Sequence, residues 1–528
     1  MKFSRARLRR IGFRLLLVAF LLAAWRLATH TVQERDARRV TLRFAHWQME
    51  PGIREALDVL ARDYERLHPD VRVEQMLIPE SIYVSWATTH VAGGSAPDLV
   101  EIGRGILGNE YYRYFDPITD EINAPNPYNR GTALEHVPWR NTFVDGLANG
   151  LEPRTLEFYG ASLFASTTRL YCNEALLREI TGRTQLPRTL PEWMELCQQV
   201  RVFAQRTGRE ITPLIGSPHI LTNEIFNGQM QRIATAANPR GAFPAEHNDL
   251  FISYLNGGWS LDDPAVRDAA ELSRLVGGQL PPGVIQLGRA STLFQFVQGH
   301  ALMYLAYSQD STGVLKQASF PISVLRLPLP GPATPRYGAH MHGPSSEGAL
   351  ATYGSFGIVR SSAHREVALD FLRFITSRAS DEKFSRVSGS LPVIVGIEPS
   401  GFIRHFMPDS HGYPPAPTLQ LWETGRAFSR SLHYLYGAEA SSAAFLADLK
   451  TGLADAMRTD LTRTIGATRR DFATSDPAIE GARQLLQANP ADAALRAKYQ
   501  ALLETQNEQE AQSYYTELRL KQSASGSP

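Results

Sequence analysis

Aromatic and polar side chains follow the ends of three strand-like segments of this chain. Trp47 and Glu50 come after segment 40–46, Arg104 comes after segment 97–102, and Tyr307 and Gln309 end segment 301–307. An aromatic ring offers a flat apolar face, and planar or charged groups satisfy hydroxyls that would otherwise be buried without partners. This combination suits the binding of a ligand better than catalysis. Trp47 could equally be a core residue, and Arg104 could equally form a salt bridge at the rim of a site.

The same segment ends lack the residue patterns of common enzymes. Residues 46–48, 79–80 and 103–105 contain no phosphate-binding glycine pattern and no nucleophile beside a base. His340 and His342 could begin a metal site, but no third ligand is evident. The two carboxylates of a glycosidase cannot be recognised without their separation. We therefore predict a binding protein with no catalytic residues, no metal site and no cofactor.

The elements that would position these side chains alternate between strand and helix. Residues 40–46 have the period-2 pattern of a half-buried strand, and Pro51 opens a helix that Pro69 ends. Strands are predicted at 71–78 and 97–102, with a helix between them. This alternation predicts parallel strands under crossover helices, whose ligands bind beyond the carboxyl ends of the strands.

A second α/β unit is predicted from about residue 155 onward. It contains strands at 167–171 and 301–307, a helix from the capping residue Thr189 to Thr207, and another helix at 262–276. A strand at 355–360 leads into a helix at 363–377. Helical patterns then run from 419 to 470, and Asp476-Pro477 and Asn489-Pro490 are predicted to begin two further helices in a polar tail.

The composition is that of a globular protein with more than one domain. The chain has 528 residues, 43% of them hydrophobic and 20% charged, and its net charge of +1 argues against a general nucleic-acid binder. Cys172 and Cys197 are the only cysteines, too few for a zinc cluster. They are predicted to be two buried thiols, with a disulfide as the alternative.

The N-terminal residues have the pattern of an export signal. Six Lys and Arg residues precede the apolar run Leu15–Trp25, and Arg26 closes it. Extended over residues 11–28, the run nearly spans a membrane. We therefore predict a periplasmic location with residues 11–29 retained as an inner-membrane anchor. Cleavage near Ala23-Ala24, with secretion to the periplasm, is the alternative.

Seven segments, taken in order, resemble the extracellular solute-binding proteins of ABC importers, in particular sugar-binding family 1. They are residues 40–47, 94–100, 170–173, 186–193, 296–303, 327–332 and 353–377. The resemblance implies two lobes that close around a ligand without altering it, joined by crossings near 157–162, 324–328 and 389–392. It also implies that Phe164 and Ser166 lie in the crevice, and that Tyr353 and Gly354 form a turn that faces the ligand.

The chain departs from the family pattern in three places. Trp25 stands where a lipid-bearing cysteine is usual, Cys172 replaces an aromatic residue, and residues 471–528 extend beyond the usual end. The predicted fold class is therefore α/β, a two-lobe periplasmic-binding-protein-like clamp of type II with an apolar N-terminal helix and a helical C-terminal tail. Its expected parts are the N-terminal signal or anchor with its linker (1–39), the first lobe (40–158), the second lobe (159–323), the returns to the first lobe (324–389) and to the second lobe (390–470), and the tail (471–528).

The predicted function is that of a solute-binding component that delivers a small molecule to the transmembrane subunits of an ABC permease. A carbohydrate is the expected solute. Trp47 and Arg104 from one lobe and Tyr307 from the other are expected to face one crevice. The alternative is a ligand sensor or scaffold that signals through its anchor and tail, and a glycan-active enzyme is a more distant alternative.

Overall fold

The computed structural model describes residues 40–525, apart from 104, 239–244, 350, 400 and 438, together with Leu17, Val18 and Phe20. The predicted anchor, residues 11–29, therefore lies almost entirely outside the described residues, as does Arg104. Within the described part of the chain, no helix is both long and apolar enough to cross a membrane.

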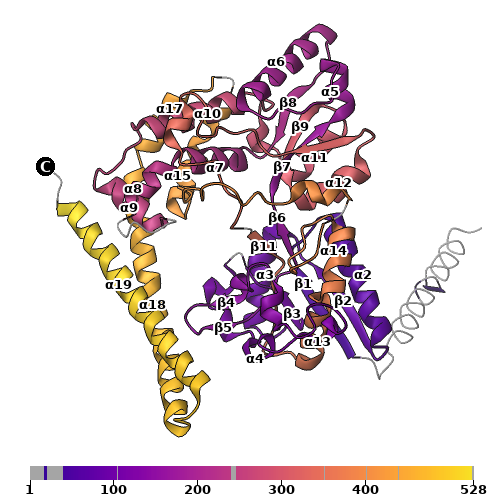
Figure 1. The fold of residues 1–528 in the computed structure, drawn as a ribbon, viewed down its shortest axis with the longest axis vertical. Helices are drawn as coiled ribbons and strands as arrows, with labels where there is room; N and C mark the ends of the chain where they lie inside the picture. Colours follow the sequence, from indigo (N-terminus) through magenta and orange to yellow (C-terminus); the bar gives the residue numbers. More distant parts are fainter. Residues whose placement is uncertain are drawn as a thin grey trace, which may run out of the picture.

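The first lobe is built on a four-stranded sheet with the order β12–β3–β1–β2 (Figure 1). β1 (Val40–His46) runs parallel to β2 (Val71–Leu77) and to β3 (Leu99–Glu101), and β12 (Phe356–Ile358) joins the edge of the sheet antiparallel to β3. The crossover helices are α2 (Pro51–Leu67) and α3 (Glu80–Ala92), and α2 begins at the proline that the sequence indicated. The predicted alternation of strand and helix is confirmed here.

Short elements and two late helices complete this lobe. Residues 106–150 form mainly short turns of helix, including α4 (Thr119–Ile122), and are followed by the ribbon of β4 (Leu151–Glu152) and β5 (Glu157–Phe158). Much later in the sequence, α13 (Arg365–Ile375) and α14 (Arg378–Ser388) return to this lobe and pack against α2. The core of this lobe therefore joins residues more than 300 positions apart, as in the hydrogen bond from Tyr64 to Asp370.

The second lobe has its own four-stranded sheet with the order β10–β7–β9–β8. β7 (Thr168–Asn173) lies antiparallel to β9 (Ala301–Tyr307) and to β10 (Ile322–Leu325), while β8 (Thr212–Gly216) is parallel to β9. Helix α6 is capped by Thr189 and ends at Gly208, both as predicted. The helices of this lobe are α5 (Glu174–Thr181), α6 (Leu190–Thr207), α7 (Pro218–Gln229), α8 (Gln231–Ala237), α9 (His247–Leu255), α10 (Pro264–Gly277), α11 (Arg289–Val297), α12 (Ser311–Gln317), α15 (Glu423–Ser431), α16 (His433–Tyr436) and α17 (Ser442–Lys450).

Both cysteines lie in the core of this lobe as free thiols. Burial raises the pKa of Cys172 and of Cys197 to about 12. Since the thiolate is the reactive form, neither side chain is a nucleophile at neutral pH. The prediction of two buried thiols is confirmed.

A narrow ribbon joins the two lobes. β6 (Phe164–Ser166) pairs antiparallel with β11 (Ala351–Tyr353), and Leu391 bridges to Ala165 from a third segment. Figure 1 shows β6 and β11 between the upper and lower lobes. The crossing expected at 324–328 is wrong, because Val324 and Leu325 belong to β10 in the second sheet and the chain leaves that lobe only at β11.

The C-terminal tail is a hairpin of two long helices that projects from the second lobe (Figure 1). α18 spans Leu453–Ala488 without a break, and α19 spans Ala493–Ser525. The prediction that a new helix begins at Asp476-Pro477 is therefore wrong. A proline in a helix interior removes one backbone hydrogen bond, and packing of α18 along α19 compensates for that loss.

Candidate ligand-binding site

A cavity of about 730 Å³ opens on the side of the second lobe next to the crossing ribbon. Its wall combines the ribbon residues Ser166 and Tyr353, Tyr307 at the end of β9, one side of α7, and the two loops 325–330 and 344–349. A cavity of this size accommodates a small molecule of several rings. It lies at the carboxyl end of β9, where open α/β sheets bind their ligands.

Helix α7 gives the cavity a polar stripe. Ser217 caps the helix by accepting a hydrogen bond from the Ile220 N–H, and Leu221, Ile225 and Phe226 are buried in the core. The other face of the helix lines the cavity. Its residues follow the helical spacing i, i+3, i+4 and i+7 and are Ile220, Asn223, Glu224 and Asn227. One helix therefore anchors the wall of the cavity and supplies amides and one carboxylate to it.

Two tyrosines provide aromatic surface in the cavity. Tyr307 is half-buried, and burial raises its pKa to about 12, so the phenol is neutral at neutral pH. Tyr353 is 37% exposed and stacks on Phe164, with ring centroids 5.7 Å apart and an interplanar angle of 22°. Gly354 follows with φ +67°, and a Cβ there would approach the Phe164 ring to 3.2 Å, so glycine is required at this turn.

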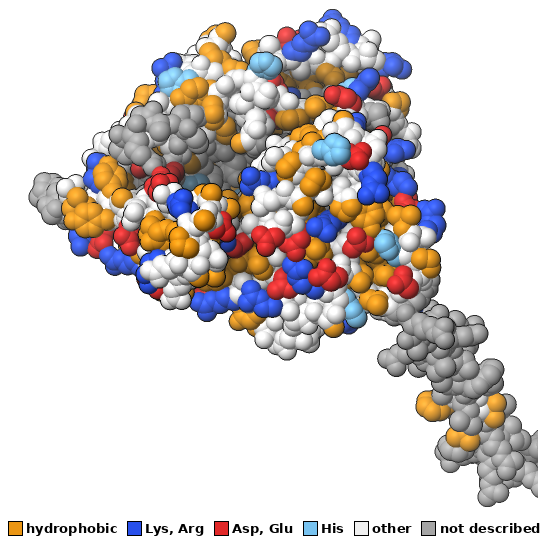
Figure 2. All heavy atoms as spheres, turned by 60° about the horizontal axis from the view of Figure 1, so that its bottom comes forward, with side chains coloured by type: hydrophobic (Ala, Val, Ile, Leu, Met, Phe, Trp, Pro, Cys, Tyr) orange, Lys and Arg blue, Asp and Glu red, His pale blue; other side chains and the backbone are white. Residues whose placement is uncertain are grey.

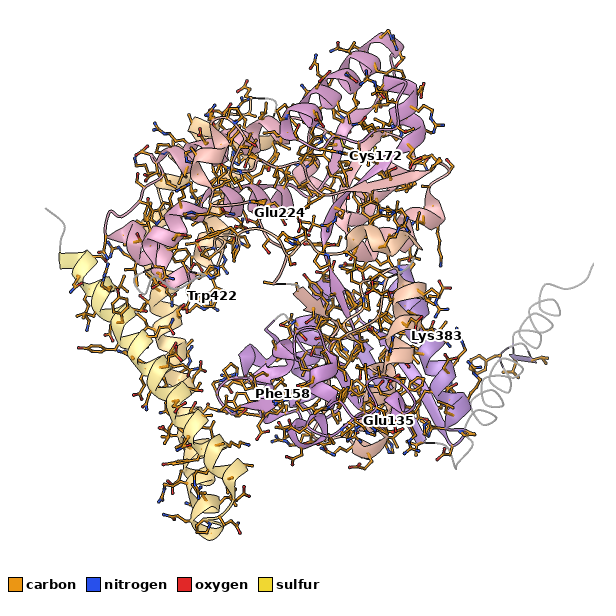
Figure 3. All side chains as sticks on the ribbon, viewed as in Figure 1. Glu135, Phe158, Cys172, Glu224, Lys383 and Trp422 are labelled. Carbon is orange, nitrogen blue, oxygen red and sulfur yellow. The ribbon has the colours of Figure 1, made fainter. Side chains whose placement is uncertain are left out.

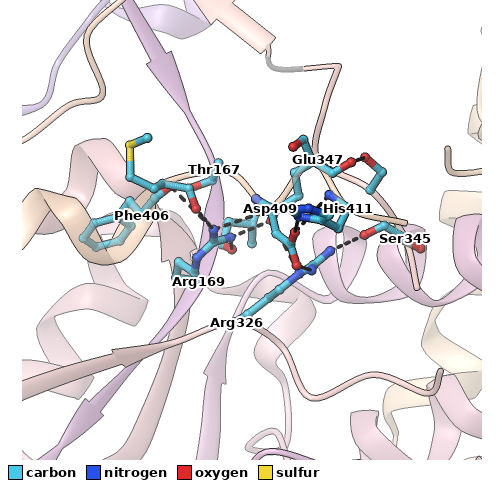
Figure 4. A network of polar contacts seen from close by, with 12 residues as sticks. Thr167, Arg169, Arg326, Ser345, Glu347, Phe406, Asp409 and His411 are labelled. Carbon is cyan, nitrogen blue, oxygen red and sulfur yellow. Dashed lines mark hydrogen bonds and ion pairs between the residues drawn. The ribbon is translucent and has the colours of Figure 1, made fainter. Parts of the chain in front are cut away.

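An extended polar network forms the wall beside the loop that carries Glu347 (Figure 4). The guanidinium of Arg169, only 3% exposed, donates to both carboxylate oxygens of Glu347 at 2.6 and 3.0 Å and also to backbone carbonyls of Thr168 and Met407. Arg326 donates to Asp409 at 2.8 Å and to the Ser345 carbonyl. The bidentate pair fixes the position of the loop, because Arg and carboxylate geometries match.

Glu224 differs from these paired charges. Burial raises the pKa of its carboxyl group, and nearby Glu347 raises it further, while Arg326 and Arg169 act in the opposite direction. Figure 3 shows Glu224 on the side of the second lobe that faces Phe158 on the first. The residue is partly exposed and contributes its carboxyl group to the cavity wall.

Two predicted residues of the first lobe, Trp47 and Glu50, are not among the described residues that line the cavity. Trp47 is half-buried and packs edge to face on Tyr83, with ring centroids 4.6 Å apart. Its backbone N–H donates to Glu101, and Glu101 also accepts from the side chain of Gln48. Trp47 therefore lies at the carboxyl end of β1, as predicted, but it contacts its own lobe.

Glu50 lies instead at a contact between the lobes. It precedes α2, and its Oε1 is 2.5 Å from Nη1 of Arg289 on α11 of the second lobe. Arg289 also pairs with Asp310 at 2.8 Å. Burial alone would lower the pKa of Arg289, but Asp310 and Glu50 raise it above its ordinary value. This triad ties α2 to the second lobe.

The remaining predicted residues divide between the cavity and the ribbon. Ser166 lines the cavity and donates a hydrogen bond to Gln309, which is buried and supports the wall from behind. Phe164 is buried beneath Tyr353. His340, considered for a metal site, lies 2.8 Å from Asp268, and no group of three or more metal-binding side chains occurs in the described part of the chain.

Sequence reasoning missed four charged residues of the site: Arg169, Glu224, Arg326 and Glu347. Two of them carried a usable signal. Arg169 is a cation inside an otherwise buried strand, and Glu224 is the only acidic residue of α7. Such isolated charges are costly in a core and therefore indicate a pair or a site. The pairing of Arg169 with Glu347, 178 residues away, has no local signal.

The sequence and the fold have counterparts among known proteins. Residues 60–404 match the family described as bacterial extracellular solute-binding protein. The chain belongs to this family. Its members are solute-binding proteins of ABC transport and not enzymes, which confirms the resemblance seen in the sequence. A search of curated proteins finds no match.

Solved structures show that this solute-binding protein has the two-lobe binding-protein fold. "SBP RafE in complex with raffinose" is 16% identical with a TM-score of 0.53, and the alignment covers 79% of this chain and 100% of that one. "Chitin oligosaccharide binding protein" is 15% identical with a TM-score of 0.54, covering 79% and 99%. "Maltose bound T. maritima MalE3" is 15% identical with a TM-score of 0.54, covering 78% and 98%. The α18–α19 hairpin is an addition to this fold.

Proposed function

We propose that this protein binds a carbohydrate in the cavity beside the crossing ribbon and delivers it to the transmembrane subunits of an ABC permease. The observation that carries the proposal is the composition of the cavity wall, in which Tyr307 and Tyr353 supply aromatic faces and α7 supplies amides and a carboxylate. Sugars present flat C–H faces surrounded by hydroxyls, so both kinds of group have a use. The structural neighbours whose titles name raffinose, chitin oligosaccharide and maltose support this class of ligand.

The mechanism that follows is clamp closure. A ligand held on the second lobe would contact the first lobe when the ribbon bends, and its binding energy would stabilise the closed form. We propose that the part of the first lobe that carries Trp47, Glu50 and Arg104 covers the ligand in that form, while the second lobe supplies most of the affinity. The location in the periplasm and the attachment through residues 11–29 belong to the same proposal, since an exported clamp must remain near its permease. So does the division of the chain into anchor, two lobes, their returns and tail, with the return to the first lobe beginning at β11 and not at residue 324.

The direct test is isothermal titration calorimetry of the purified protein with a panel of mono- and oligosaccharides. Binding of at least one saccharide is expected, and Tyr307→Ala should weaken it. A response to amino acids or metal ions with none to any saccharide would refute the carbohydrate assignment.

Charge on the face shown in Figure 2 is mixed, with acidic and basic side chains interspersed, which agrees with a ligand other than nucleic acid.

The tail favours a second candidate function, that of a ligand sensor. α18 packs on α15 and α9 of the second lobe, yet Asp471 pairs with Arg154 of the first lobe at 2.7 Å and Thr474 lies 2.9 Å from the Tyr112 hydroxyl. Lys498 on α19 pairs with Glu157. The hairpin thus touches both lobes, so a change in the angle between them would change these contacts.

Uptake and signalling distinguish the two functions. Asp471→Asn combined with Lys498→Ala would release the hairpin from the first lobe while leaving the cavity intact. A sensor would lose its response with ligand affinity unchanged. If the double variant took up solute and signalled like the unaltered protein, solute delivery would remain as the function.

A further inference from the structure

One acidic side chain of the cavity has no partner within the described part of the protein. Glu224 forms neither a hydrogen bond nor an ion pair there, although it lies on the polar stripe of α7. On the same helix, Gln229 also lines the cavity; it is 1% exposed, and its Oε1 accepts no hydrogen bond. Both groups are hydrogen-bond acceptors. The Gln229 oxygen lies beneath the surface, whereas Glu224 is partly exposed, so Glu224 is the acceptor that this part of the wall offers a ligand.

The cations near Glu224 are already engaged. Arg169 is bound to Glu347 and Arg326 is bound to Asp409, so each guanidinium is matched by a carboxylate of its own. The remaining cation of the lining, Arg188, is exposed at the rim, where solvent screens its charge. Tyr307, the other titratable group close to Glu224, is neutral. Inside the cavity, Glu224 is the one acid without a counter-ion in the described part of the wall.

We propose that Glu224 selects a ligand that carries a protonated amine, a saccharide of the amino-sugar type, and binds that amine through an ion pair inside the cavity. This inference rests on the proposed function and specifies the ligand of the same site.

The chemistry of the acceptors supports an ammonium group over a hydroxyl. An ammonium group has three donors and no acceptor, whereas a hydroxyl has one donor and also needs donors for its own oxygen. Closure around the ligand would remove water from Glu224, and an ionised carboxylate in such a site is costly unless a cation accompanies it. Burial already raises the pKa of Glu224, in agreement with an acid that lacks its counter-ion.

The test uses the full-length protein and pairs of oligosaccharides that differ at one position. Calorimetry at pH 7 compares glucosamine oligosaccharides with glucose oligosaccharides of the same linkage and length. The amino form is expected to bind at least about tenfold more tightly, the effect of one hydrogen-bonded charge pair. Glu224→Gln keeps the shape of the side chain but removes its charge. It should abolish this preference, so that the amino form and the neutral form bind with similar affinity.

A pH series and a control variant complete the experiment. The affinity for the amino form should fall as the pH decreases toward the raised pKa of Glu224, because the carboxylate would take up a proton, and this dependence should disappear in Glu224→Gln. Glu210→Gln, an exposed acid of the same lobe, should behave like the unaltered protein. Tighter binding of the neutral form, or a preference that survives in Glu224→Gln, would overturn the inference and leave the proposed function standing. If no saccharide bound, neutral forms included, both the inference about Glu224 and the proposed function would be overturned.

Discussion

The two lobes use the ends of their strands differently. In the second lobe, Tyr307, α7 and the Glu347 loop surround a cavity, and Glu224 lies in its wall without a partner among the described residues. In the first lobe, the corresponding residues contact other parts of the protein: Trp47 packs on Tyr83, and Glu50 pairs with Arg289. This difference suggests an order of events. Under the proposed function, the ligand would dock on the second lobe and the first lobe would then cover it.

The wall of the cavity depends most strongly on Arg169. Arg169→Ala would leave the Glu347 carboxylate and several carbonyls without their donor in a site that is largely buried. Breaking a buried pair in this way costs about 3–5 kcal/mol of the free energy of unfolding. Urea denaturation would measure the loss.

Arg209→Ala is the matched control for that experiment. Arg209 pairs with Glu179 at 2.7 Å in the same lobe, but the two side chains are 46% and 51% exposed. A solvated pair of this kind contributes no more than about 1 kcal/mol. Equal losses for the two variants would show that the network at the cavity is no more important for stability than a surface ion pair.

The first lobe also contains an acid whose pKa is raised by burial, as that of Glu224 is in the second lobe. Asp381 on α14 is buried and accepts hydrogen bonds from the N–H groups of Val393 and Ile394, and burial raises its pKa to about 7. The folded state holds this proton more tightly than the unfolded state does. Its stabilising effect is complete below about pH 4 and is lost as the pH rises toward 7.

Asp381→Asn removes this titration. The stability of the variant relative to the unaltered protein should therefore increase by about 3 kcal/mol between pH 5 and pH 8. Denaturation curves at several pH values would test this, with Glu210→Gln as an exposed control. A constant difference across the range would mean that Asp381 is ionised in the folded protein.

The tyrosines of the second lobe should determine ligand affinity. Tyr307→Ala and Tyr353→Ala each remove a ring from the cavity wall, and we expect affinity to fall about ten- to hundredfold, in line with about 1–3 kcal/mol of stacking. Thermal stability should change much less. Calorimetry and thermal unfolding of the same samples would separate the two effects.

Trp47→Ala is the corresponding aromatic substitution in the first lobe. The sequence predicted that Trp47 is a ligand platform, so that its removal would weaken binding. Its packing on Tyr83 instead suggests a loss of about 2 kcal/mol in stability. A large drop in affinity with little change in stability would mean that Trp47 meets the ligand when the lobes close.

The elements that the sequence predicted well are those with local signals. Residues 301–307 form the expected strand, and α6 begins after Thr189 and ends before Gly208, since a cap and a glycine act within one turn. The continuous α18 was missed because its packing against α19 overrides the helix-breaking tendency of Pro477. The ribbon at β11 was also missed, because a three-residue strand is defined only by its distant partner, β6.

The site was harder to predict for a related reason. Tyr307, Ser166 and Tyr353, which strand ends and the family resemblance indicated, line the cavity, and their contact with a ligand stays a prediction. The charged wall arises from contacts between segments that are far apart, such as Arg326 with Asp409. Periodicity and spacing contain no information about such pairs.

The smallest expected effect belongs to Glu50, and it tests the division between the lobes. Its ion pair with Arg289 joins the lobes. Glu50 is 10% exposed and Arg289 is 44% exposed, and a glutamine keeps the hydrogen bond, so Glu50→Gln should change the free energy of unfolding by about 1 kcal/mol. Ligand affinity should change less than about fivefold, because Glu50 does not line the cavity. Glu55→Gln is the matched control, since Glu55 also lies on α2 and pairs with Lys316 of the second lobe. If Glu50→Gln weakened binding about a hundredfold while Glu55→Gln did not, Glu50 would be a ligand contact, as the sequence predicted. The first lobe would then recognise the ligand directly as well as cover it.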